Sequence, residues 1–278
     1  MYSESKLSYS KILKVRVEKR LHAIISNMTE EVTKSKPLII AHRGASALAP
    51  ENTMAAFRLA KQLGADGIEL DVMLSADGQL VVIHDQSVSR TTNGQGKVNE
   101  MRWDELKKLD AGASFDERFS GESLPLLEHV FEELGGQFLI NVELKNYATP
   151  KDQLTEEVIK LIQKTGLMNS VILSSFKATN LLKVEKLAPD LPRGLLTLPG
   201  LLGIPYRGWL GKRYHYDALH PYFKDVNSSL VRRLHKQGKK VNVWTVDKPE
   251  DLCRMRDLGV DMVICNDPAH AREIIEAA

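Results

Sequence analysis

From Pro37 onward, the chain alternates short apolar runs with longer segments in which apolar residues recur at helical spacing. The apolar runs predict strands at 38–41, 67–73, 80–83, 138–144, 171–175, 194–198, 218–220, 240–246 and 262–265. The intervening segments predict helices at 53–63, 126–134, 151–165, 178–187, 228–237, 249–258 and 268–276. Such alternation is typical of α/β proteins with parallel strands, and about eight units in about 240 residues favour a closed (β/α)8 TIM barrel over an open sheet.

Two segments depart from this alternation. Residues 86–123 are rich in Gly, Ser, Thr and charge and are too long for an ordinary loop, so they predict a small insertion after the second strand region. Residues 1–36 precede the barrel at 37–278, and a basic amphipathic helix is predicted within them. This extension fits an anionic membrane surface, a cap on the barrel or a simple appendage, and the sequence leaves these open.

Charge and composition exclude several classes of protein. Residues 1–27 hold six Lys or Arg and two Glu, a charge of +4, so the remaining residues carry −2 of the total of +2, and no nucleic-acid partner is expected. The longest uncharged apolar stretch, 195–206, is too short to span a bilayer. With only two cysteines and no apolar leader segment, a cytoplasmic location is expected. Phosphate-binding loops, serine-hydrolase elbows and His-Glu-x-x-His motifs are absent from the sequence.

Carboxylates alternate with apolar residues in two of the predicted strands. Glu69 and Asp71 share one face of their strand, and Asn141, Glu143 and Lys145 share one face of another. Carboxylates that point into a barrel repel one another and raise a pKa or require a cation. Oxygen ligands without Cys suit Mg²⁺ or Ca²⁺, and both cations stay open, as does the alternative that Glu69 and Asp71 are simply exposed.

Two histidines follow apolar strands, His42 after 38–41 and His84 after 80–83. Because barrel active sites form at the carboxyl ends of strands, we expect both side chains near the acidic residues. A pair of histidines beside Arg43, Lys145 and a divalent cation matches what phosphodiester hydrolysis requires: cations neutralise the phosphoryl oxygens, and the imidazoles move protons.

These residues form a series of motifs that resembles the glycerophosphodiester phosphodiesterase family. In order, the motifs are His42-Arg43-Gly44-Ala45, Pro50-Glu51-Asn52-Thr53, Glu69-Leu70-Asp71-Val72, His84-Asp85 and Glu143-Leu144-Lys145. The likeness runs from about Pro37 to the C-terminus and includes Ser175-Phe176, Val243-Trp244-Thr245 and Asn266-Asp267-Pro268. It departs at Leu126, where the family more often has Thr at the start of a helix.

The resemblance implies an enzyme, a phosphoric diester hydrolase that converts glycerophosphodiesters to sn-glycerol 3-phosphate and an alcohol. Carried over position by position, His42 and His84 are the general acid and base, and Arg43 and Lys145 hold the phosphate. One divalent cation would be bound by Glu69, Asp71 and Glu143. Whether the attacking oxygen belongs to water or to the neighbouring glycerol hydroxyl stays open.

Aromatic and apolar residues raise the question of substrate. Phe176 and Trp244 fit an apolar wall against the glycerol backbone, with a purely structural role as the alternative, whereas His220 is expected to be structural. The apolar residues at 195–210 fit an acyl chain, a weak membrane contact or a packed loop, and residues 1–27 also fit a weak membrane contact. They motivate a rival activity of lysophospholipase D type. A non-catalytic phosphodiester-binding barrel is the rival from another class, and a zinc amidohydrolase is disfavoured because the first strand ends in His42-Arg43 instead of His-x-His. Oligomeric state is not predicted.

Overall fold

The computed structural model describes residues 36–277. The helix predicted in the N-terminal extension lies outside the described residues. Within them, no helix is both long and apolar enough to cross a bilayer.

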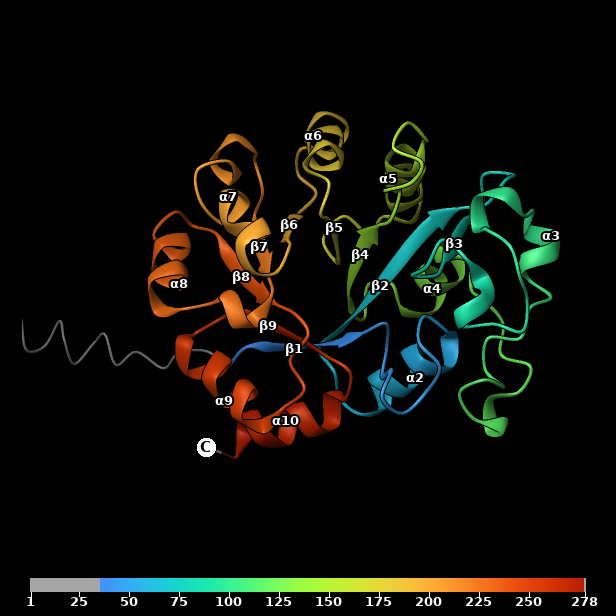
Figure 1. The fold of residues 1–278 in the computed structure, drawn as a ribbon, viewed down its shortest axis with the longest axis horizontal. Helices are drawn as coiled ribbons and strands as arrows, with labels where there is room; N and C mark the ends of the chain where they lie inside the picture. Colours follow the sequence, from blue (N-terminus) through green and yellow to red (C-terminus); the bar gives the residue numbers. More distant parts are fainter. Residues whose placement is uncertain (1–35, 278) are drawn as a thin grey trace, which may run out of the picture. The chain divides into compact units, whose positions relative to one another are not determined.

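Eight parallel strands form a closed barrel, which confirms the predicted fold class (Figure 1). The barrel closes because β1 pairs with both β2 and β9. Along the sheet the strands are β1 (Leu38–His42), β2 (Gly67–Leu74), β4 (Leu139–Leu144), β5 (Val171–Ser175), β6 (Arg193–Thr197), β7 (Ala218–Pro221), β8 (Lys240–Val243) and β9 (Met262–Cys265). The register sets His42 beside Glu69 and, two residues further along β2, Asp71 beside Glu143, so polar residues of three strands lie close together.

The predicted strand at 80–83 does not belong to the parallel barrel. It forms β3 (Leu80–Val82), which turns back and pairs antiparallel with the extended end of β2. His84 therefore does not end a parallel strand as predicted, although it still reaches the mouth of the barrel. It does so because the chain after β3 runs back alongside β2, where Ile83 N donates to Asp71 O at 3.0 Å.

Every helix predicted within residues 36–277 is present, with ends that differ by up to three residues. These helices are α2 (Met54–Gln62), α4 (Leu127–Leu134), α5 (Leu154–Thr165), α6 (Ala178–Leu187), α8 (Ser228–His235), α9 (Pro249–Leu258) and α10 (Pro268–Glu276). The Thr53 hydroxyl caps α2 by accepting from Ala56 N, whereas Leu126 begins α4 without a side-chain cap, a role that Thr could fill. The short helix α7 (Ile204–Arg207) between β6 and β7 was not predicted.

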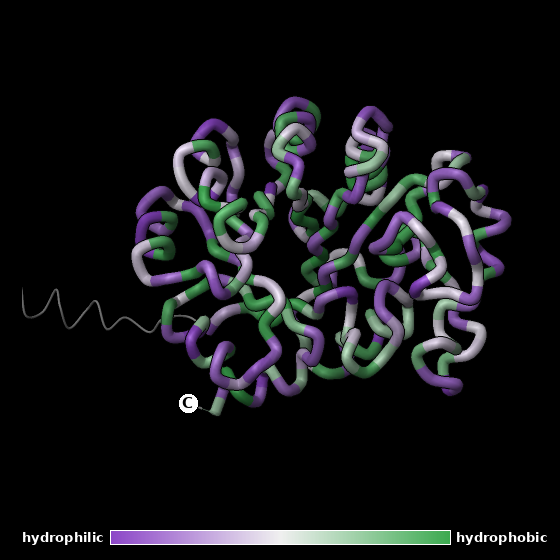
Figure 2. The backbone as a smooth tube through the Cα atoms, viewed as in Figure 1, coloured by the Kyte–Doolittle hydropathy of each residue, from purple (hydrophilic) through white to green (hydrophobic). Residues whose placement is uncertain are grey.

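Apolar packing lies mainly between the strands and the surrounding helices. The outward residues Ile68 and Leu70 of β2 are fully buried in one cluster with Phe57 of α2 and Leu127 of α4. Burial of each such side chain contributes roughly 1.5–3 kcal/mol. In Figure 2 the strands are mainly hydrophobic, while the helices alternate between hydrophobic and hydrophilic residues. Because this outer layer supplies the core, the inward faces of β2 and β4 are available for polar residues.

The predicted insertion packs on a small core of its own. It contains three 3₁₀ turns, at Val88–Arg90, Val98–Glu100 and Glu117–Phe119, and the helix α3 (Trp103–Leu106). Val88, Val98 and Leu106 are buried against Val81 and Ile83 around β3. The insertion thereby supports the segment that carries His84.

Candidate active site

A cavity of about 80 Å³ opens at the carboxyl ends of the barrel strands. Its walls contain all the predicted site residues except Asp71, namely His42, Arg43, Glu69, His84, Glu143, Lys145, Phe176 and Trp244, together with Asn141, Ser174, Leu196 and Ile264. Asp71 adjoins the cavity through its contacts with Arg43 and Lys145. The structure thus gathers the predicted residues around a single space.

Three buried carboxylates form the floor of this site. One oxygen from each of Glu69, Asp71 and Glu143 lies within 4.8 Å of the others, and Asp71 is only 1% exposed. The alternative of two exposed carboxylates at a strand end is excluded. An all-oxygen set of buried carboxylates fits a hard divalent cation, so the cluster could bind a metal ion.

The carboxylates differ in their electrostatic surroundings. Burial raises the pKa of Glu69 well above its ordinary value, and the neighbouring Asp71 and Glu143 raise it further. Burial and Asp71 also raise the pKa of Glu143. Burial opposes ionisation of Asp71, but Lys145 and Arg43 outweigh it and lower its pKa. Crowded carboxylates whose pKa values rise in this way favour binding of a further cation.

Two basic side chains compensate part of this charge. Lys145 Nζ lies 3.1 Å from Glu143 Oε1 and 3.6 Å from Asp71 Oδ1. Arg43 Nε lies 3.3 Å from Asp71 Oδ2, and its Nη1 donates to Glu51 Oε1 at 2.8 Å. Arg43 has a left-handed backbone (φ 56°), and Gly44 follows at φ 82°. Position 44 requires glycine, because a Cβ there would also lie 2.6 Å from the Ala56 backbone. This turn points the Arg43 backbone N–H at Glu69 Oε2, 3.2 Å away.

His42 is held by a neutral amide. Its Nδ1 lies 2.7 Å from Asn266 Oδ1, and Asn266 Nδ2 donates to Asp247 Oδ2 at 2.7 Å. Because the amide nitrogen is engaged by Asp247, the oxygen faces the imidazole, which places the His42 proton on Nδ1 and leaves Nε2 as an acceptor. Burial, followed by the charge of Arg43, lowers the pKa of His42 to about 4. The ring is therefore neutral at neutral pH.

His84 is held by a carboxylate instead. Its Nδ1 contacts Asp85 Oδ1 at 2.5 Å, and the other Asp85 oxygen accepts from Arg90 Nε at 2.5 Å. Burial opposes ionisation of Asp85, but Arg90 and His84 lower its pKa to about 2. Arg90 also donates to both oxygens of Glu51, at 2.8 and 2.9 Å, and Glu51 in turn binds Arg43. An ion-pair chain thus connects His84 with Arg43.

The opposite wall is neutral. The Phe176 and Trp244 rings meet edge to face, with centroids 5.6 Å apart, and Tyr222 lies 5.7 Å from Trp244. Trp244 Nε1 donates to His220 O at 2.9 Å, which fixes the indole. His220 is buried inside the barrel below this wall, where Asn242 Nδ2 contacts its Nε2, and burial lowers its pKa to about 3. Gly194 provides the space, since a Cβ there would lie 2.5 Å from that nitrogen.

Sequence reasoning missed several residues that support the site. Asn52, which the sequence shows only as part of a motif, has φ 57° and binds Asp71 through both ends of its amide, with Nδ2 2.9 Å from Asp71 Oδ2. Tyr147 donates its hydroxyl to Glu143 Oε1 at 2.9 Å. Asn266 stands out in the sequence only as part of a motif, and nothing in the sequence singles out Asp247. The positive φ of Asn52 is a conformation that Asn adopts more readily than most residues, but no sequence signal pairs it with Asp71.

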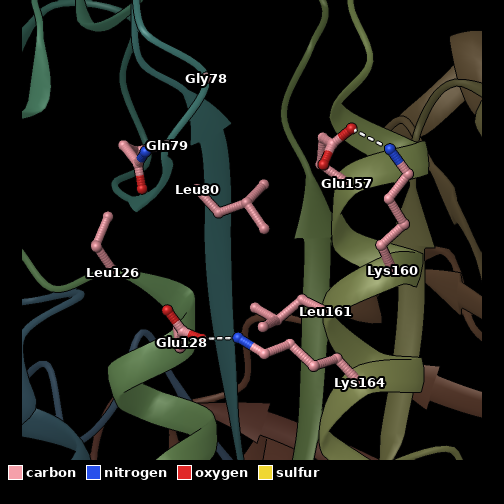
Figure 3. A pocket seen from close by; sticks show the side chains of 9 residues that line it. All are labelled: Gly78, Gln79, Leu80, Leu126, Glu128, Glu157, Lys160, Leu161 and Lys164. Atoms are coloured by element: carbon pink, nitrogen blue, oxygen red, sulfur yellow. Dashed lines mark hydrogen bonds and ion pairs between the residues drawn. The ribbon is translucent and has the colours of Figure 1, made fainter.

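Two larger cavities lie elsewhere in the described residues. One of about 250 Å³, between the β2–β3 turn, α4 and α5, is shown in Figure 3, and its charges are paired as Lys164 with Glu128 and Lys160 with Glu157. The other, of about 430 Å³, lies at the amino ends of the strands and contains the Arg193–Asp217 ion pair. Neither brings together histidines and clustered carboxylates, so size alone does not identify the site.

Comparison with known proteins gives one family. The model of the "Glycerophosphoryl diester phosphodiesterase family" matches residues 42–270. The glycerophosphodiester phosphodiesterase of Caldanaerobacter subterraneus subsp. tengcongensis is 47% identical over 234 residues, which cover 84% of this chain and 95% of that protein.

Solved structures agree with this match. A phosphodiesterase of Oleispira antarctica in complex with the product sn-glycerol-3-phosphate aligns with a TM-score of 0.77 and 29% identity, over 86% of this chain and 97% of that one. A glycerophosphodiester phosphodiesterase from Agrobacterium tumefaciens aligns with a TM-score of 0.75 and 32% identity, over 87% and 100% of the respective chains.

Proposed function

The chain belongs to the glycerophosphoryl diester phosphodiesterase family, and from this premise we propose that it hydrolyses glycerophosphodiesters to sn-glycerol 3-phosphate and an alcohol by histidine acid–base catalysis with one divalent cation. One observation carries the proposal. His42 and His84, held by different partners, line one cavity with the Glu69 and Glu143 carboxylates and with Lys145.

His42 is proposed as the general base. With its proton on Nδ1 directed to Asn266, the Nε2 lone pair is available to accept a proton from the attacking oxygen. A pKa of about 4 keeps the ring unprotonated at neutral pH. Asn266 and Asp247 act as positioning residues, because they fix the tautomer and the orientation of the ring.

His84 is proposed as the general acid. The Asp85 carboxylate holds Nδ1 and fixes the orientation of the ring, which leaves Nε2 to donate a proton to the departing alkoxide. Arg90 holds Asp85 in place from the other side. The difference between the partners, an amide for His42 and a carboxylate for His84, supports the division of roles.

Lys145 and Arg43 are proposed to bind the phosphoryl oxygens, and Glu69, Asp71 and Glu143 to bind the cation, Mg²⁺ or Ca²⁺. Such a cation, when bound, neutralises developing charge on the phosphate. Phe176 and Trp244 are proposed to contact the carbon backbone of the glycerol. The attacking oxygen belongs to water or to the adjacent glycerol hydroxyl, and accumulation of a cyclic glycerol phosphate would identify the second route.

A second candidate activity is release of the head group from lysophospholipids. It is favoured by the exposed apolar residues between β6 and β7, among them Leu201 at 82% exposed. Turnover of glycerophosphocholine compared with lysophosphatidylcholine separates the two, and a strong preference for the acylated substrate would replace the first candidate. A cytoplasmic location remains part of the proposal and fits the two cysteines, which form no disulfide.

The test is release of glycerol 3-phosphate from glycerophosphocholine by purified protein, with EDTA, Mg²⁺ and Ca²⁺ arms. His42→Ala is expected to lower the rate by about 10²–10⁴-fold, and the matched control His129→Ala, on the exposed face of α4, to leave it unchanged. Full activity in EDTA would contradict the proposed requirement for a divalent cation. Full activity of His42→Ala would contradict the general base.

A further inference from the structure

The most exposed large apolar side chains of the described residues lie on one segment between β6 and β7. Leu201 is 82% exposed, Leu202 74% and Trp209 65%, and Ile204 and Leu198 follow at 52% and 48%. The exposed apolar residues elsewhere reach at most 44%. Side chains of this kind scattered singly need no explanation, but a contiguous group marks an interaction surface. We refer to residues 198–213 as the apolar segment.

The apolar segment is held in shape by polar contacts behind it. Arg207 Nη1 and Nη2 donate to the carbonyls of Leu198 and Gly200 at 2.9 and 2.7 Å, and Gly200 N donates to Asp225 Oδ2 at 2.9 Å. Arg207 also pairs with Asp225 at 3.0 Å. These bonds fix the backbone just before Leu201 and tie it to the side chain of Arg207, which follows Leu202. The leucines are therefore exposed to solvent on a turn that hydrogen bonds and an ion pair hold in place.

The charge of the surrounding sequence has one sign. The apolar segment itself, 198–213, holds three Lys or Arg and no Asp or Glu, and of the three only Arg207 has an ion-pair partner among the described residues, Asp225. Lys212 and Arg213 are exposed, and the Arg213 guanidinium lies 5.6 Å from the centroid of the Trp209 ring. Apolar side chains, a tryptophan and flanking basic residues together are the composition of segments that lie at the surface of anionic bilayers.

The apolar segment also lies at the functional end of the barrel. It follows the carboxyl end of β6, and Leu196 of β6 lines the active-site cavity. On the other side, Tyr222 after β7 packs on Trp244 at the cavity wall. A bilayer bound to the segment would therefore adjoin the mouth of the barrel.

We propose that the apolar segment docks the protein on the surface of an anionic phospholipid bilayer through Leu201, Leu202 and Trp209, with Lys212 and Arg213 at the headgroups. Docking in itself is independent of catalysis. Its consequence, that phosphodiesters released at or held in the membrane are delivered to the site, rests on the proposed function.

The test measures co-sedimentation of the full chain with vesicles of phosphatidylcholine alone or of equal parts phosphatidylcholine and phosphatidylglycerol. Binding is expected only with the anionic vesicles and is expected to weaken with added salt, because the basic contacts are screened. The double variant Leu201→Ser/Leu202→Ser is expected to bind at least about tenfold more weakly, since two leucines lose their apolar contact. The control is Leu182→Ser/Leu187→Ser, which changes two half-exposed leucines of α6 outside the segment.

Tryptophan fluorescence gives a second measurement. Emission should shift to shorter wavelength on anionic vesicles, and the shift should disappear in Trp209→Phe while the Trp103 and Trp244 signals remain. Turnover of water-soluble glycerophosphocholine by the leucine variant should equal that of the unmodified chain, which separates docking from catalysis and confirms folding.

Three outcomes would overturn the proposal. The first is the absence of binding to anionic vesicles. The second is binding that survives in the Leu201/Leu202 variant, which would place the lipid contact elsewhere in the chain. The third is concentration-dependent self-association that requires the two leucines, together with no binding to vesicles. This result would make a second copy of the chain the partner.

Discussion

The two halves of the cavity wall are built on different principles. The half formed by β1, β2 and β4 presents Glu69, Glu143 and Lys145, with Asp71 adjoining, and its charged groups are tied to one another and to residues behind them. The half formed by β5, β6 and β8 presents Ser174, Leu196 and the ring of Trp244, all neutral. A phosphodiester has the same division between a charged phosphoryl group and uncharged alcohols. The comparison suggests that one half does the chemistry and the other receives the alcohol.

The halves also differ in how their polar side chains are held, although the charged half too has a buried atom without a hydrogen-bond partner among the described residues, Asn141 Oδ1. In the charged half, Asn52 and Tyr147 donate hydrogen bonds to Asp71 and Glu143. In the neutral half, Ser174 Oγ and Thr197 Oγ1 are buried without a protein partner among the described residues. A network in which each member holds the next is sensitive to single changes, whereas a partnerless hydroxyl can be removed at little cost.

The largest effect is expected from Glu143→Gln in the charged half. Loss of a carboxylate from the cation cluster should lower the rate by about 10³-fold or more, because several kcal/mol of charge stabilisation are removed. Burial and Asp71 raise the pKa of Glu143 in the folded protein, so the ionised carboxylate lowers the free energy of unfolding at neutral pH. The variant should therefore unfold at an equal or higher temperature in EDTA. Steady-state kinetics and thermal unfolding measure the two effects.

Glu128→Gln is the matched control, because Glu128 is half-buried on α4, pairs with Lys164 (Figure 3) and does not line the active-site cavity. Calorimetric titration with Mg²⁺ and Ca²⁺ should show binding to the control and not to Glu143→Gln. A Glu143→Gln protein that keeps its activity would remove the charged half from the chemistry.

The second effect concerns the amide behind His42. Asn266→Ala frees the imidazole and is expected to lower kcat by about 10- to 100-fold with little change in KM, because the base loses its orientation. Asn266→Asp places a carboxylate on Nδ1 and should raise the pKa of His42. Since the base must be unprotonated, the acid limb of kcat/KM against pH, near pH 4 in the unmodified chain, should move to higher pH. An unmoved limb would show that it belongs to another group.

How far the sequence could predict this site depends on the range of the contacts. The alternation in β2 and β4 is local, so Glu69, Asp71 and Glu143 could be assigned to the inward faces of their strands from the sequence alone. His42 could be placed because β1 is an ordinary parallel strand. The closed barrel itself follows from the repeated alternation.

Contacts that depend on closure or on irregular backbone could not be predicted. Asn266 reaches His42 across 224 residues, because β9 pairs with β1. Asn52 contacts Asp71 from a backbone with positive φ, a conformation that its sequence context does not indicate. His84 reaches the mouth through the antiparallel turn of β3, which apolar periodicity cannot distinguish from a parallel strand.

A third prediction tests the neutral half. Trp244→Ala removes the ring that lines the cavity and should raise KM for glycerophosphocholine by about tenfold with a smaller change in kcat, because uniform contact with the substrate is lost. Trp244→Phe keeps an aromatic face, so its KM should lie between those of the unmodified chain and Trp244→Ala. A fall in kcat at constant KM would instead assign Trp244 to the chemistry.

The smallest effect, on the free energy of unfolding, is expected at Ser174, and it is best compared with the effect of a change at Tyr147. The Tyr147 hydroxyl joins the two halves: it donates to Glu143 and accepts from Phe176 N at 3.2 Å. Tyr147→Phe should lower the free energy of unfolding by about 1–3 kcal/mol, since a charged acceptor and a backbone N–H both lose a partner. Ser174→Ala removes a hydroxyl without a protein partner among the described residues. Its free energy of unfolding, measured in urea, should therefore change by less than about 0.5 kcal/mol. If Ser174→Ala costs as much as Tyr147→Phe, the neutral half depends on a polar network as the charged half does, and the contrast between them fails.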